Sequence, residues 1–159
     1  FDKSTEDDRK LLYHGSGLVV ERPVMREVRY FKDFGYGFYC TNIEKQAKRW
    51  ALTKKPNNIV NIYPYIHNSE LKILNFEEMT DEWLEFVVSC RRGISHGYDI
   101  VEGPMADDQI YNYVSDYMDG VITREQFWVL AKFRYPTHQI AFCTDIALQC
   151  LEYRNCEVF

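Results

Sequence analysis

Residues 33–41 read Asp-Phe-Gly-Tyr-Gly-Phe-Tyr-Cys-Thr, and this stretch decides the fold. Its two glycines, Gly35 and Gly37, allow the backbone to bend as it enters the next segment. The apolar and aromatic residues of that segment predict a short strand over 37–40. Thr41 with Glu44 three residues later is a capping-box pattern, so a helix is predicted to begin at Thr41, directly after the strand. The apolar face of this helix consists of four residues at helical spacing, Ile43, Ala47, Trp50 and Ala51.

Short strands and helices alternate on both sides of this stretch. The sequence predicts further strands over 11–14, 59–66, 71–74, 98–101 and 139–143, and an edge strand in 152–159. It predicts further helices that begin at Thr80, near Asp107, at Thr123 and at Asp145. Residues 18–34 are predicted to form a loop with one helical turn.

This interleaving indicates a mixed α/β (α+β) domain. A doubly wound fold is not predicted, because no glycine-rich dinucleotide fingerprint follows a strand. No repeat or Gly/Ser linker divides the chain. Residues 1–10 are therefore expected to form a solvated arm, and 11–159 a single domain.

The composition excludes several classes of protein. The chain of 159 residues is 46% apolar and 27% charged, which is typical of a globular protein rather than a disordered one. Its net charge is −5 and it has no dense Lys/Arg run, so nucleic acid is a poor candidate for its partner. It contains no apolar run long enough to predict a membrane helix.

The cysteines predict reduced thiols rather than disulfides or a metal site. Their number is odd, there is no CxxC pair, and no His stands at metal spacing. We therefore expect no bound metal, and a reducing, cytoplasmic location or delivery as an effector. Because the sequence begins at Phe1 and not at Met, we expect part of a longer protein, whose native targeting is not visible here.

Three separated segments each place a polar or aromatic residue at the end of a predicted strand. They are Tyr-His-Gly-Ser at 13–16, Gly-Tyr-Gly-Phe-Tyr at 35–39 and His-Gln-Ile-Ala-Phe at 138–142. Trp50 follows Tyr39 on the next helix, after ten intervening residues. None of these signals is specific alone, but their order and spacing can be compared with those of known protein families.

The arrangement resembles the His-Tyr-Glu group of the ADP-ribosyltransferase superfamily, which contains diphtheria-type toxins and the poly(ADP-ribose) polymerases. The chain is also similar to a bacterial family of domains of unknown function, number 3990, within that superfamily. This closer resemblance rests on residues 33–41 and 98–108 and extends over nearly the whole chain. It implies an ADP-ribosyltransferase-like fold, in which split mixed and antiparallel β-sheets surround an NAD cleft with flanking helices.

The resemblance also assigns roles to individual residues, with NAD as the co-substrate. Tyr39 and Trp50 would hold the nicotinamide ring between them. The backbone of Gly15 would pair with the carboxamide, with Ser16 as a second contact. His14 would donate a hydrogen bond to a ribose hydroxyl. The alternatives are a core role for Trp50 on the apolar face of its helix and a structural role for His14.

Gln139 stands where the resemblance places a catalytic Glu. It can bind the ribose but has no negative charge, and loss of such a group costs on the order of a hundredfold in rate. Asp107 or Asp108 could supply the missing carboxylate, although both also fit helix capping, and Glu102 is a weaker candidate. Increased turnover of a Gln139→Glu variant would identify the ribose-binding position.

The expected function is a mono-ADP-ribosyltransferase that uses NAD to modify a macromolecule, presumed from the resemblance to be a protein. An NAD glycohydrolase differs only in that water is the acceptor. A catalytically silent pseudoenzyme that binds NAD or ADP-ribose is favoured by Gln139. A plain interaction domain would account for the many aromatic residues, which make up 16% of the chain.

Overall fold

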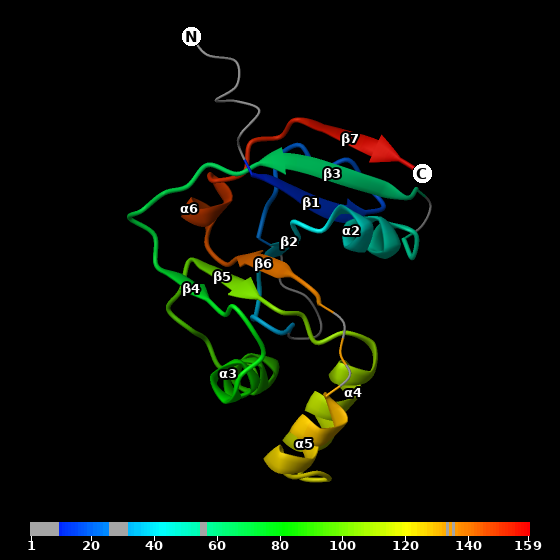
Figure 1. Ribbon diagram of the computed structural model, residues 1–159. Helices are drawn as coiled ribbons and strands as arrows, with labels where there is room; N and C mark the ends of the chain where they lie inside the picture. The colour runs from blue at the N-terminus through cyan, green and yellow to red at the C-terminus, as the bar shows by residue number, and fades with distance from the viewer. Residues whose placement is uncertain (1–9, 26–31, 55–56, 133, 135) are drawn as a thin grey trace.

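The computed structural model describes residues 10–25, 32–54, 57–132, 134 and 136–159, apart from the side chain of Asp108. The predicted arm, except for Lys10, and the middle of the predicted loop at 18–34 lie outside these residues. Figure 1 shows two small sheets stacked between helices. The predicted mixed α/β class is confirmed.

The strands form two separate sheets. The first sheet is antiparallel and has the order β1-β3-β7, with β1 at Leu11–Ser16, β3 at Ile59–Pro64 and β7 at Asn155–Val158. The second has the order β2-β6-β5-β4, with β2 at Phe38–Cys40, β6 at Gln139–Phe142, β5 at Ile100–Gly103 and β4 at Ile73–Asn75. Its β4–β5 pair is parallel and its other pairs are antiparallel. As predicted, the C-terminal segment forms an edge strand.

The helices are α2 at Glu44–Ala51, α3 at Asp81–Arg91, α4 at Asp108–Met118, α5 at Arg124–Leu130 and α6 at Asp145–Leu148. The predicted starts at Thr80 and Thr123 are confirmed, because each hydroxyl accepts a backbone N–H of the first turn. The last helix is capped by Thr144 rather than by Asp145. None of these helices, over the described residues, has the length and apolar character needed to cross a membrane.

The predicted capping box at Thr41 is wrong. The N-cap of α2 is Ile43, and no side chain caps this helix. Thr41 is instead used in strand pairing, because its N–H and C=O exchange hydrogen bonds of 2.9 and 2.8 Å with Tyr13. This bridge joins β1 of the first sheet to the end of β2 in the second, so the chain must stay extended at Thr41.

Three hydrophobic clusters show how the two sheets and the helices are layered. Ala47 and Ala51 of α2 pack against β3 on the outer face of the first sheet. Between the sheets lies a cluster that includes Leu12, Phe38 and Phe142. The other face of the second sheet packs against α3, α4 and α5, and there Trp83 of α3 is fully buried. All five cysteines are free, and three of them are buried.

Gly15 permits the close approach of α2 to β1. A Cβ at this position would lie 2.5 Å from the carbonyl oxygen of Ala47 and 2.9 Å from the amide nitrogen of Ala51. Both are backbone atoms of the helix, so a side chain can be accommodated only by moving the helix away. The glycine after His14 is therefore needed for packing, whatever its relation to a ligand.

We expect Gly15→Ala to lower the free energy of unfolding by about 2–3 kcal/mol, because it overpacks the contact between β1 and α2. Urea unfolding followed by circular dichroism would measure this loss. Gly97→Ala is the matched control, since nothing lies within 4 Å of a Cβ there. Equal stability of the two variants would contradict the packing role of Gly15.

Candidate functional site

The His14 side chain, on β1, faces the second sheet. Its Nδ1 lies 2.6 Å from the carbonyl oxygen of Tyr39, and its ring stacks on Phe38 with 4.1 Å between centroids. The pKa of His14 is lowered to about 4, mainly by burial and also by the charges of Lys32 and Lys54, whereas the hydrogen bond to Tyr39 acts in the opposite direction. At neutral pH the imidazole is therefore uncharged.

The tautomer of His14 follows from these contacts. A carbonyl oxygen can only accept, so Nδ1 carries the proton and donates it to Tyr39. The Nε2 atom of the neutral ring is then left with a lone pair. The donor role expected for His14 toward a ribose hydroxyl is thus replaced by an acceptor role.

Tyr39 is held by the loop that precedes β2. Its hydroxyl donates to the carbonyl oxygen of Gly35 at 2.7 Å and accepts from the N–H of Phe34 at 3.0 Å. Burial raises the pKa of this phenol well above its ordinary value. The ring is therefore fixed in place and neutral, and its hydroxyl is already used within the chain.

Trp50 is 51% exposed, so the alternative of a core tryptophan is wrong. The neighbouring Ala47 and Ala51 fill the buried side of α2 instead. The indole still lies against β1, since its Cδ1 is 3.2 Å from the position of a Cβ on Gly15. An exposed indole beside the strand that carries His14 is available to a ligand. Ser16, at the end of the same strand, accepts the N–H of Leu18 at 3.1 Å.

Two lysines join these residues into one region. The Lys32 ammonium lies 5.0 Å from the centroid of the Tyr39 ring, and the Lys54 ammonium lies 4.6 Å from the Trp50 ring. Both charges lower the pKa of His14. Burial lowers the pKa of Lys32, and the charge of Lys54 lowers it as well. These contacts and charge effects link five side chains, which are His14, Lys32, Tyr39, Trp50 and Lys54. We call them the aromatic–lysine cluster.

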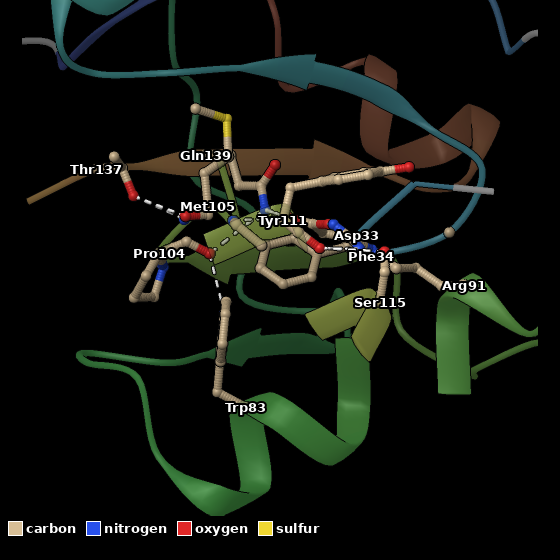
Figure 2. Close-up of polar contacts among 12 residues, drawn as sticks. Asp33, Phe34, Trp83, Arg91, Pro104, Met105, Tyr111, Ser115, Thr137 and Gln139 are labelled. Atoms are coloured by element: carbon tan, nitrogen blue, oxygen red, sulfur yellow. Dashed lines mark hydrogen bonds and ion pairs between the residues drawn. The ribbon is translucent and has the colours of Figure 1, made fainter. Parts of the chain in front are cut away.

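Gln139 lies in a buried polar network (Figure 2). Its Nε2 donates to Asp33 Oδ2 at 3.0 Å and to the carbonyl oxygen of Pro104 at 3.3 Å. Asp33 Oδ1 accepts from Arg91 at 2.6 and 3.0 Å, and Asp33 Oδ2 also accepts the N–H of Ala106 at 2.8 Å. The network links the loop before β2, α3, the loop before α4, and β6.

The register of the second sheet relates Gln139 to Tyr39. Tyr39 is paired with Ala141, and Gln139 precedes Ala141 by two residues. Alternate residues of a strand point to the same face, so Tyr39 and Gln139 share the face that packs on α3 and α4. His14 reaches Tyr39 from the other sheet through the backbone.

Of the proposed replacement carboxylates, Glu102 lies on the other face of the sheet from Gln139, whereas Asp107 and Asp108 lie at the start of α4. Asp107 is the N-cap residue of α4, although its side chain makes no capping hydrogen bond. Asp108 begins α4, and its side chain lies outside the described part of the chain. Glu102 pairs opposite Ile140 and so points to the other face of the sheet from Gln139.

Glu102 belongs to a different polar group. His138 Nε2 lies 2.6 Å from Glu102 Oε2, and Lys10 lies 3.1 Å from the same oxygen. The hydrogen bond from His138, followed by Lys10, lowers the pKa of Glu102. His138 Nδ1 accepts the N–H of Asn42 at 3.0 Å, and the Gln46 amide bonds both the N–H and the C=O of His138. This group fastens α2 to β6.

Sequence reasoning missed three of these partners. Asp33 was quoted within the stretch at 33–41 but was given no role, and neither Arg91 nor Gln46 was singled out. A buried acid next to a glycine-rich strand entry is the one available signal for Asp33. Nothing local in the sequence marks Arg91, because its partner is 58 positions away.

The fold and the cluster define a mixed α/β protein in which two facing sheets carry a neutral imidazole, exposed and buried aromatic rings, and two lysines. The chain belongs to the family described as Protein of unknown function (DUF3990), whose model matches residues 11–153. This confirms the predicted family, whereas the ADP-ribosyltransferase superfamily remains a prediction. No curated protein matches the chain.

Acidification should destabilise the chain through His14. The ordinary pKa of 6.5 applies to the unfolded chain, and the folded value is about 4. Between these values the unfolded state binds more protons, so the stability present above pH 6.5 is lost as the pH falls toward 4. The loss amounts to at most about 3 kcal/mol. Urea unfolding at a series of pH values would measure it.

His14→Gln should remove most of this loss between pH 6.5 and 4.5, because no imidazole remains to be protonated. Glu102→Gln is the control. The lowered pKa of Glu102 affects stability only below its ordinary value of 4.5, so that variant should keep the slope above this pH. A His14→Gln variant with the slope of the parent would show that another group is responsible.

Proposed function

We propose that this chain is an NAD-dependent mono-ADP-ribosyltransferase that modifies a macromolecule. The observation that supports the proposal is the aromatic–lysine cluster, in which His14 contacts the Tyr39 carbonyl and Trp50 lies beside Gly15, the residue after His14. Gln139 lies on the same sheet face as Tyr39. The contact between His14 and the Tyr39 carbonyl joins two different sheets, so it is not a consequence of local structure.

The chemistry of these residues suits NAD as a substrate. The rings of Tyr39 and Trp50 offer faces for nicotinamide. The lone pair of His14 Nε2 would accept a ribose hydroxyl, and the acyl oxygen of Gln139 would accept another. The two lysines provide positive charge for the diphosphate.

The reaction breaks the bond between the ribose C1′ and the nicotinamide nitrogen. Nicotinamide leaves with the bonding electrons, and a nucleophile of the acceptor forms the new bond to C1′ and gives up its proton. His14 and Gln139 would orient the ribose without a negative charge of their own, and the neighbouring Asp33 is paired with Arg91. We therefore expect slow turnover, with the acceptor providing a strong nucleophile.

A second candidate is a silent module that binds NAD or ADP-ribose. The observation in its favour is the same pairing of Asp33 with Arg91, which leaves Gln139 beside a neutralised carboxylate. An NAD glycohydrolase would use the same residues with water as the acceptor. The three functions share one binding site and differ in the fate of C1′.

Binding can be tested by the thermal stabilisation that NAD confers. We expect NAD to raise the Tm of the parent, and Trp50→Ala and Tyr39→Ala to lose most of this shift, because each removes one ring face. Trp128→Ala removes the same indole from α5, at the other end of the molecule from α2, and should keep the shift (Figure 1). Equal shifts in all variants would refute the assignment of the site.

Mass analysis after incubation with NAD and a cell extract should separate the three functions. Transfer predicts acceptor proteins heavier by one ADP-ribose, together with free nicotinamide. Hydrolysis predicts free ADP-ribose and nicotinamide without modified protein, and a silent module predicts intact NAD. His14→Gln should reduce the turnover by roughly tenfold or more if it removes a hydrogen bond to the ribose. A rate equal to that of the parent would exclude such a role for His14.

A further inference from the structure

The side-chain amide of Gln139 has only one orientation. Both partners of its nitrogen, Asp33 Oδ2 and the carbonyl oxygen of Pro104, can only accept hydrogen bonds. The NH₂ group must therefore face them, and its two hydrogens are both used. The acyl oxygen is the one polar atom of the amide that remains for another partner.

Asp33 is itself held firmly. Its side chain and that of Arg91 are 8% and 7% exposed, and their closest N···O distance is 2.6 Å. The backbone N–H of Ala106 adds a further donor to Asp33 Oδ2. A buried carboxylate that accepts this many hydrogen bonds is held in place, so it fixes the amide that donates to it.

A glutamate at position 139 would not fit this environment. It would place a second carboxylate 3.0 Å from Asp33 Oδ2 and beside the Pro104 carbonyl, where the parent has two N–H donors. Arg91 neutralises one negative charge, which leaves the second one buried without a partner. The expectation that Gln139→Glu would raise turnover therefore conflicts with the geometry.

We infer that Asp33 is a positioning residue, which holds the Gln139 amide so that its acyl oxygen serves as a dedicated hydrogen-bond acceptor. Position 139 then selects a ligand group that donates, such as a hydroxyl, and excludes an ionised acid. The identification of that hydroxyl with a ribose rests on the proposed function, whereas the exclusion of a glutamate does not.

The exclusion is tested by melting temperatures at pH 7.5 and pH 5. Gln139→Glu should lower the Tm by roughly 6–10 °C at pH 7.5. The loss should shrink at pH 5, because the new carboxyl group then binds a proton and can donate to Asp33. Gln149→Glu makes the same change at an exposed position and should shift the Tm by only about 1–2 °C at either pH.

Rescue distinguishes positioning from simple packing. Asp33→Asn combined with Gln139→Glu restores one negative charge and supplies an amide donor for the new carboxylate. The loss of Tm in this double variant should be smaller than the sum of the two single losses. Additive losses, or a Gln139→Glu penalty that is the same at both pH values, would overturn the inference.

The ligand side is tested by titration with NAD. Gln139→Met keeps the length of the side chain but lacks the acyl oxygen, and it should weaken NAD binding about tenfold. NAD binding by this variant at the parent's affinity would overturn the acceptor role while the proposed function stood. If the parent itself binds no NAD, the proposed function fails, and the melting experiments alone decide whether Asp33 orients the amide.

Discussion

The buried ion pair between Asp33 and Arg91 is the interaction on which the rest of the site depends. It joins the loop before β2 to α3, and the free oxygen of Asp33 extends the contact to Ala106 and Gln139. An isolated buried charge would be costly, and an ion pair offsets that cost only when its remaining hydrogen-bonding positions are filled. Here Asp33 receives donors on both oxygens, so four segments distant in sequence meet in one arrangement.

Further contacts connect the strands and the helix that carry the candidate site residues. The Tyr13–Thr41 bridge ties the strand of His14 to the strand of Tyr39, and the missing side chain of Gly15 allows α2 to bring Trp50 beside them. The pairing of Gln46 with the His138 backbone then fastens α2 to β6. Each contact alone is modest. Together they connect β1, β2, α2 and β6, and each of them involves backbone atoms.

Local signals in the sequence were reliable where a few neighbouring residues determine the structure. The caps at Thr80 and Thr123 were predicted because a hydroxyl and an amide three residues apart are sufficient for them. Thr41 has the same local pattern, but the capping box predicted there is wrong. Its backbone N–H and C=O form hydrogen bonds with Tyr13, which lies on a distant strand. Local pattern cannot show which distant strand will compete for a residue.

The candidate site was predictable in part for the same reason. His14, Tyr39 and Trp50 could be selected by their spacing. The structure brings His14 to the carbonyl of Tyr39 and Trp50 to Gly15, whereas a shared ligand site stays a prediction. The partners of Gln139 could not be found in this way, since Asp33 is 106 positions away. The exposure of Trp50 could not be predicted either, because helical spacing places it on the same apolar face as Ala47 and Ala51, which are buried.

The lysines above Tyr39 and Trp50 have a consequence for selectivity. Each ring face already contacts an ammonium group of the chain, so an incoming aromatic ring exchanges one attraction for another. A neutral ring alone would gain little from that exchange. A molecule that joins a flat ring to a nearby anion would gain binding free energy from two sources. Its ring would contact the aromatic side chain, and its anion would pair with the displaced ammonium group. Under the proposed function, the intact, charged ligand is therefore expected to bind more tightly than its fragments.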